Sequence, residues 1–228
     1  MGAVEHTDSI LFNGLRLPTE RHLEYLEFLS RQCANLGIGW AVKGSLARGT
    51  AREHSDIDLL LFMPKELIII DDLVEFSEPL MVNFTQRPAG IVMITYAGGL
   101  CVELDCREAI SQDEYDDVVI ISDRNLQIAS GEIVRKHVLT KYAGDKPWSM
   151  DLRLLYKSLI KYLCHREEAA EGLLREFEEK VQQPAPVTGY SQKAEHLYGL
   201  FRHNQSIGEK LDNEIRSLLE KAKQRDSR

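Results

Sequence analysis

One stretch of this chain joins a glycine turn to two carboxylates, and an apolar run of strand length lies on each side of it. The turn covers residues 44–49, and the carboxylates are Asp56 and Asp58. Residues 38–42 are apolar before the turn, and residues 59–62 are apolar after the acidic pair. This order predicts a strand, a sharp turn into a short helix over 45–52, and a second strand over 57–63 that begins with acidic residues.

The residues of the turn suit a phosphate group. Gly44 has no Cβ, so its backbone can turn sharply and approach a ligand closely. Ser45 offers a hydroxyl and a backbone N–H group, which are donors that an anion accepts. Arg48 follows them and Lys43 precedes them, so either cation can reach a triphosphate, although each also fits a solvated surface position. We expect a nucleotide-binding turn at Gly44, Ser45 and Arg48, with Lys43 as a further candidate.

The acidic pair suits a divalent metal. Residues two apart on a strand point to the same face, which brings the carboxylates of Asp56 and Asp58 together. Mg²⁺ is a hard ion that prefers oxygen ligands and often shares them with substrate phosphates. A single Asp-x-Asp pair is more often a solvated strand face, but its place after the turn favours a metal site.

The pattern Gly-Ser, a second glycine four residues after the serine, and Asp-x-Asp resembles the signature of the DNA polymerase β-like nucleotidyltransferase superfamily. The matching residues are Gly44, Ser45, Gly49, Asp56 and Asp58. By order of elements the resemblance covers about residues 18–145. It implies that a nucleoside monophosphate is transferred from an NTP to an acceptor with release of pyrophosphate. ATP is the expected NTP and Mg²⁺ the expected cofactor, with two ions in the site.

The family carries a third acidic residue on a later strand of the same sheet, and residues 99–106 resemble that strand. Asp105 fits best, because the family pattern is an Asp between apolar residues and its neighbours are Leu104 and Cys106. Glu103 lies on the same strand face and stays open as the alternative. The resemblance implies that the third carboxylate completes the metal site and helps the acceptor hydroxyl to lose its proton.

The remaining sequence predicts an α+β fold: a mixed β-sheet flanked by helices over residues 1–145, then an all-helical region over 146–228. Thr19 begins a helix whose apolar residues repeat at helical spacing. Residues 90–96 and 100–106 form a predicted hairpin around Gly98-Gly99, and strands are predicted at 118–121 and 126–129. From Trp148 onward the pattern is helical, with a break at 184–189 and an interruption near 204–208.

Charge and composition indicate which kinds of partner the protein binds. The net charge of −8 is uneven, because residues 1–145 carry 13 Lys or Arg and 23 Asp or Glu. An acidic catalytic half disfavours nucleic acid, whose backbone binds basic surfaces, and favours small or cationic acceptors. No run of apolar residues has membrane-spanning length, no leader segment is evident, and the four cysteines are scattered. These features predict a cytoplasmic protein with reduced thiols and no membrane partner.

Length and a helical second half are similar to those of aminoglycoside and lincosamide nucleotidyltransferases. We therefore expect an Mg²⁺-dependent nucleotidyltransferase that acts on a hydroxyl of a small molecule. Three alternatives stay open: a protein adenylyltransferase of the antitoxin type, an oligonucleotide or cyclic-dinucleotide synthase, and an inactive nucleotide-binding module. The intact Asp56 and Asp58 disfavour the last of these.

Overall fold

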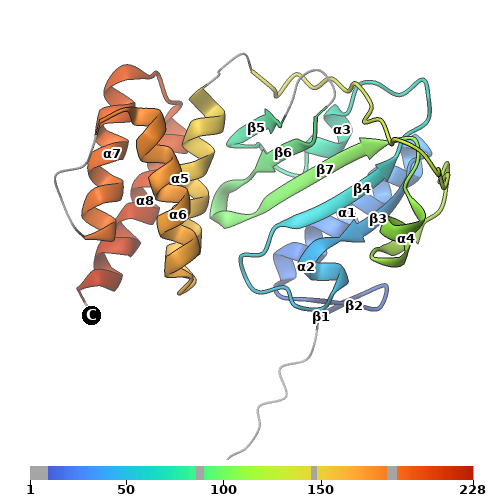
Figure 1. The fold of residues 1–228 in the computed structure, drawn as a ribbon, viewed down its shortest axis with the longest axis horizontal. Helices are drawn as coiled ribbons and strands as arrows, with labels where there is room; N and C mark the ends of the chain where they lie inside the picture. The colour runs from blue at the N-terminus through green and yellow to red at the C-terminus, as the bar shows by residue number, and fades with distance from the viewer. Residues whose placement is uncertain (1–9, 86–89, 145–147, 184–188, 228) are drawn as a thin grey trace, which may run out of the picture. The chain divides into compact units, whose positions relative to one another are not determined.

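The computed structural model describes residues 10–85, 90–144, 148–183 and 189–227, and Figure 1 shows their fold. The chain divides into two compact units. The first contains Met1–Pro79, Phe84–Thr95 and Leu100–Ala143, and the second contains Leu80–Asn83, Tyr96–Gly99 and Gly144–Arg228. The predicted boundary between residues 145 and 146 lies outside the described residues.

Six strands of the described chain form one mixed sheet, which confirms the predicted α+β class. Its order is β5-β6-β7-β4-β3-β8. The strands are β3 (Gly39–Lys43), β4 (Ile57–Phe62), β5 (Met81–Phe84), β6 (Val92–Thr95), β7 (Cys101–Arg107) and β8 (Val119–Ser122). The pair β4–β7 is parallel, whereas β3–β4, β3–β8 and β6–β7 are antiparallel. The predicted hairpin is confirmed as β6 and β7, which the turn Ala97–Gly99 joins.

The central strand β4 is apolar on both faces, as expected for a strand that is covered from both sides. Leu59 and Leu61 are buried on one face, while Leu60 and Phe62 are buried on the other. Leu60 and Phe62 belong to a buried cluster with Ala41 and Ile110. Only Asp58 interrupts the run of buried residues in the strand. The sheet core therefore holds β4 firmly and leaves one acidic side chain half-buried near its start.

The first helix, α1 (Glu20–Leu36), forms as the sequence predicts. Thr19 is its N-cap and accepts a hydrogen bond from the His22 N–H group. Gly37 ends the helix at a φ of 67°, a left-handed conformation that favours glycine. The buried face of α1 includes Tyr25, Leu26, Leu29 and Cys33. Three short helices complete this unit: α2 (Gly44–Ala47), α3 (Asp71–Val74) and α4 (Gln112–Asp116).

Two local predictions differ from the structure. The helix predicted over 45–52 is the four-residue α2, because Gly49 has a φ of 67° and turns the chain out of the helix. Residues 126–129 form one isolated bridge between Ile128 and Ile110 rather than a strand. Four elements were not predicted: β5, α4, and the two strands of a hairpin, β1 (Ile10–Phe12) and β2 (Leu15–Leu17).

The second unit is built mainly from α5 (Trp148–Leu163), α6 (Glu167–Val181), α7 (Tyr190–Asn204) and α8 (Glu209–Asp226). The predicted interruption near 204–208 is confirmed by the gap between α7 and α8, while residues 184–188 of the other predicted break lie outside the described residues. The turn Tyr96–Gly99 belongs to this unit: the Tyr156 hydroxyl accepts from the Gly99 N–H group at 3.1 Å, and Glu214 accepts from Gly98 at 2.8 Å.

None of the helices that the structure describes combines the length and the apolar character needed to cross a membrane.

Candidate active site

Gly44 and Asp58 lie against each other where β3 ends. Lys43, the last residue of β3, is the antiparallel partner of Asp58 on β4, so the turn begins beside the Asp58 carboxylate. A Cβ atom placed on Gly44 would lie 2.1 Å from Oδ2 of Asp58. The φ of Gly44 is also +68°, which L side chains rarely adopt. Gly44 is therefore required twice, for the backbone conformation and for the close approach of the carboxylate.

The turn after Gly44 is closed by its own backbone. Arg48 donates its N–H to the Gly44 carbonyl at 3.2 Å, and Thr50 donates to the Ser45 carbonyl at 2.9 Å. Leu46 is 1% exposed and anchors the turn in the core. Ser45 is half-buried and Arg48 is exposed. The predicted nucleotide-binding residues thus lie on one rigid turn, with Arg48 at its outer end.

The parallel pair β4–β7 places Asp58 directly opposite Glu103, and Leu60 opposite Asp105. Residues directly opposite on neighbouring strands point to the same face of a sheet. Asp58 and Glu103 are both half-buried, and Asp56 directly precedes the first residue of β4. The two strands therefore bring three carboxylates, from Asp56, Asp58 and Glu103, to one end of the sheet.

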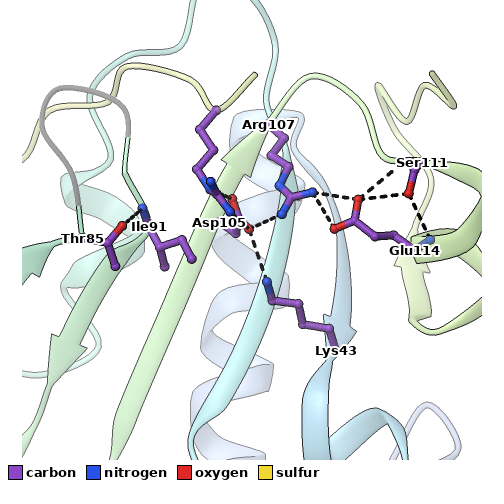
Figure 2. A network of polar contacts seen from close by, with 8 residues as sticks. Lys43, Thr85, Ile91, Asp105, Arg107, Ser111 and Glu114 are labelled. Atoms are coloured by element: carbon purple, nitrogen blue, oxygen red, sulfur yellow. Dashed lines mark hydrogen bonds and ion pairs between the residues drawn. The ribbon is translucent and has the colours of Figure 1, made fainter. Parts of the chain in front are cut away.

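Asp105 lies deeper on the same face, fully buried, and three cations surround its carboxylate (Figure 2). Arg107 donates to Oδ2 at 2.5 Å, Arg135 donates to Oδ1 at 2.8 Å, and Lys43 donates to Oδ2 at 3.2 Å. Burial by itself would raise the pKa of Asp105, but the hydrogen bonds from Arg107 and Arg135 and the charges of Arg107 and Lys43 hold it below its ordinary value. Asp105 is therefore a buried anion that holds three cations.

The network continues from Arg107 to the start of α4. The Arg107 guanidinium donates to both oxygens of Glu114, at 2.7 and 2.8 Å, as Figure 2 shows. Glu114 also completes a capping box with Ser111, the N-cap of α4. Arg107 is 7% exposed, so its charge is balanced within the protein by two carboxylates. The network links Lys43 on β3, Asp105 and Arg107 on β7, and Glu114 on α4.

These contacts separate the two candidates for the third carboxylate. Asp105, the preferred candidate from the sequence, is enclosed by Lys43, Arg107 and Arg135. Glu103, the alternative, is the register partner of Asp58. The geometry favours Glu103. Sequence reasoning did not identify Arg107 or Arg135. The alternation of residues 103, 105 and 107 along β7 places Arg107 on the same face, but no local pattern points to Arg135.

The donor chemistry of the site matches Mg²⁺, because carboxylate oxygens are hard ligands. Gly44 adds to this match, since its missing Cβ leaves room for the Asp58 carboxylate. As the side chains lie, however, no group of three or more His, Cys, Asp or Glu residues within the described ranges could by itself hold a metal ion. The protein side chains therefore form an incomplete ligand set.

Two cavities open on the helical unit, and neither is lined by a predicted site residue. One measures about 680 Å³ and lies along α7 and α8, where Tyr198, Arg202 and Arg216 line it. The Asp212 carboxylate accepts hydrogen bonds from Tyr198 at 2.6 Å and from Arg216 at 3.0 Å. The other cavity is lined by residues of α5, α7 and α8, including Tyr162, Tyr190 and Asp226.

Comparison with known proteins gives a match to a protein-family model. Searches of curated proteins and of solved structures gave no significant match to this chain. The family model of the nucleotidyltransferase domain matches residues 20–98, a range that includes α1, the Gly44 turn, Asp56 and Asp58. Residues 20–98 are therefore a nucleotidyltransferase domain of the polymerase β-like superfamily.

Proposed function

We propose that the protein transfers a nucleoside monophosphate from an NTP, with ATP as the expected donor, to a hydroxyl of a small-molecule acceptor. Pyrophosphate leaves as the new phosphate ester bond forms. One observation carries the proposal: Asp58 lies between the glycine turn and Glu103, against Gly44 on one side and in register with Glu103 on the other. A phosphate on the turn would therefore lie beside two carboxylates.

Asp56, Asp58 and Glu103 are the residues that would hold Mg²⁺, with two ions expected. When bound, Mg²⁺ would neutralise phosphate charge and stabilise an in-line displacement at phosphorus. Phosphate oxygens of the NTP would complete the ligand set that the protein leaves incomplete. The assignment of Glu103 rests on its register with Asp58, and the earlier candidate Asp105 is the alternative that mutagenesis distinguishes below.

The chain's own groups have separate roles in this scheme. The Gly44 turn admits the triphosphate, and the N–H and hydroxyl of Ser45 donate to its oxygens. Arg48, exposed at the end of α2, balances phosphate charge from outside. Lys43 is 28% exposed while its Nζ donates to Asp105, so it adds positive charge on the side of the sheet that carries Asp58. Glu103 would accept the proton of the acceptor hydroxyl.

The charge of the chain supports a small cationic acceptor. Residues 1–145 carry ten more acidic than basic side chains, and such a surface attracts cations and repels nucleic acid. The four long helices after residue 147 provide a second compact unit beyond the nucleotidyltransferase domain. Aminoglycosides are hydroxylated polycations and are therefore the first acceptors to test.

The test is transfer of label from each of the four α-³²P-labelled NTPs, with Mg²⁺, to a panel of aminoglycosides, lincosamides and purified proteins, together with measurement of pyrophosphate. We expect label on a small molecule and an equal amount of pyrophosphate. Asp58→Asn is the control, and it should lower transfer by more than ~100-fold while the circular dichroism spectrum stays unchanged. Label on protein alone would replace the small-molecule acceptor with a protein. No transfer with any of the four NTPs would overturn the proposal.

A further inference from the structure

A buried histidine on α1 contacts the loop that leads into the candidate metal site. His22 is 2% exposed and lies in the first turn of the helix. Its Nε2 lies 3.1 Å from the carbonyl oxygen of Ser55, and its Nδ1 lies 2.7 Å from Oγ1 of Thr19. Ser55 directly precedes Asp56 in the chain. The imidazole therefore connects the start of α1 to the peptide bond that leads into Asp56.

The chemistry of the partners fixes how His22 is bonded. A carbonyl oxygen only accepts hydrogen bonds, so Nε2 carries the proton and donates to Ser55. In a neutral ring Nδ1 then accepts, and the Thr19 hydroxyl is its donor. Burial lowers the pKa of His22 below its ordinary value, against the opposite effect of the Ser55 carbonyl, so the ring is neutral at pH 7. The two hydrogen bonds therefore favour one tautomer of the ring, with the proton on Nε2.

Every polar group of Ser55 is then bonded. Its N–H donates to the Arg52 carbonyl at 2.8 Å, and its Oγ accepts from the Arg52 N–H at 2.9 Å. Only the bond from His22 reaches Ser55 from outside this local turn among the bonds described here. Strand β4 begins at Ile57, so the ladder holds the chain on the far side of Asp56 only. On the other side of Asp56, the Ser55 peptide is held by its turn with Arg52 and by His22.

We propose that His22 is a positioning residue, which orients the Ser55–Asp56 peptide so that the Asp56 carboxylate enters the candidate metal site in one direction. The inference rests on the proposed function, because it takes Asp56 as a metal ligand. Removing a group that hydrogen-bonds to a metal ligand and orients it typically lowers metal affinity or activity by about 10- to 100-fold. His22 would orient Asp56 by its hydrogen bond to the Ser55 carbonyl rather than by a contact with the carboxylate.

Two substitutions separate the two ring nitrogens. In His22→Gln the side-chain amide reaches about as far as Nε2 and can still donate to Ser55. In His22→Asn the amide ends near the position of Nδ1, so it keeps the contact with Thr19 and loses the one with Ser55. Both variants place an amide at the same buried position, so they differ mainly in which of the two contacts is kept. Cys33→Ala, on the buried face of the same helix, controls for loss of α1 packing alone.

The readouts are Mn²⁺ binding, measured by electron paramagnetic resonance with α,β-methylene-ATP present, and hydrogen exchange of a peptide covering residues 53–58. We expect His22→Asn to weaken Mn²⁺ binding by about 10-fold or more and to speed exchange in that peptide. His22→Gln should stay within about 3-fold of the wild type. Equal behaviour of the two variants, or a loss that only follows stability as in Cys33→Ala, would overturn the proposal.

A variant-free measurement covers the case in which a variant does not fold. The ¹⁵N chemical shifts of the wild-type His22 ring should show a proton fixed on Nε2, and a ring protonated on Nδ1 would overturn the proposal. Absence of Mn²⁺ binding by the wild type would instead refute the proposed function and the ligand role of Asp56. The exchange data would then still decide whether His22 holds the Ser55–Asp56 peptide.

Discussion

Asp58 on β4 and Glu103 on β7 are register partners in the one parallel strand pair with a described register, so their carboxylates emerge side by side from the same face of the sheet. Two residues further along β7, Asp105 is fully buried among Lys43, Arg107 and Arg135. One strand thus presents two acidic residues in opposite settings. The first is half-buried at the candidate site, and the second is fixed inside an ion-pair network.

This contrast predicts opposite results for two matched substitutions on β7. Asp105→Asn removes the negative charge that faces three cations, and losing one partner of a buried pair costs roughly 3–5 kcal/mol of unfolding free energy. Glu103→Gln should change the unfolding free energy by less than about 1 kcal/mol, because Glu103 is half-buried, but it should lower nucleotide transfer by more than ~100-fold. Urea unfolding and single-turnover transfer measure the two effects. Normal stability with lost transfer in Asp105→Asn would restore Asp105 as the third carboxylate.

Two glycines of the turn allow the effect of backbone strain to be separated from the effect of a clash with Asp58. Gly44 has a φ of +68° and Gly49 a φ of +67°, so an alanine at either position costs about 1–2 kcal/mol in a left-handed conformation. Only at Gly44 would the new Cβ meet the Asp58 carboxylate; at Gly49 nothing lies within 4 Å. Gly44→Ala should therefore abolish transfer, whereas Gly49→Ala should lose only the stability that the backbone strain costs and keep most of its activity.

Thermal melts of the two variants, with transfer assays below the melting range, test this expectation. If Gly49→Ala lost as much transfer as Gly44→Ala, strain in the turn would explain both results. The close approach of Gly44 to Asp58 would then have no special role in the reaction.

Metal and nucleotide should stabilise the protein together rather than separately. In the proposed function the described carboxylates do not hold Mg²⁺ by themselves, and the triphosphate would bring the further oxygens as well as the charge that Mg²⁺ neutralises. At ~100 times its dissociation constant, a ligand adds about 2.7 kcal/mol. Thermal melts with ATP, Mg²⁺, both or neither should show a large shift only with both. An equal shift for ATP in excess chelator would contradict metal-bridged binding, and Asp58→Asn should lose the shift.

Local patterns were enough to predict the parts of the fold that depend on neighbouring residues. The apolar runs around the Gly44 turn became β3 and β4, and Gly98-Gly99 marked the turn of the β6–β7 hairpin. The hairpin of β1 and β2 had a comparable signal that the sequence reading did not use: Asn13-Gly14, both with positive φ, between apolar residues. Residues 126–129 have strand composition, but only one bridge, to Ile110, pairs them.

The ion-pair network depends on residues far apart in the sequence, which explains why it was not predicted. Lys43 and Asp105 are 62 positions apart, and Asp105 and Arg135 are 30 apart. Apolar neighbours made Asp105 the favoured third carboxylate, but the same neighbours describe a strand residue that faces the core. Whether Asp105 is a third site carboxylate or a core-facing strand residue depends on the register of β4 and β7 and on where the cations lie.

The network also predicts how stability depends on pH. The pKa of Asp105 is lowered, so its ionised form stabilises the fold fully above the ordinary Asp pKa, and this contribution is lost as the pH falls through the lowered value. Lys43 is one of the three cations that lower it. Lys43→Met should therefore reduce the unfolding free energy at pH 6 by about 1.5–3 kcal/mol, the range for a hydrogen bond to a charged group. The difference from the wild type should shrink only below the ordinary Asp pKa of about 3.9, and it should vanish once the pH lies below the lowered pKa at which folded Asp105 takes up its proton.

Urea unfolding at several pH values, from 6 down to below the lowered pKa of Asp105, measures this difference. Lys221→Met, at an exposed position on α8, is the control, and its small effect should not vary with pH over that range. Below the ordinary Asp pKa the unfolded chain binds the proton that folded Asp105 resists, so wild-type stability must fall with pH there. A difference between Lys43→Met and the wild type that stays constant even where Asp105 of the folded wild type has taken up its proton would mean that Lys43 stabilises the fold through its aliphatic chain. Its ion pair with Asp105 would then contribute nothing measurable.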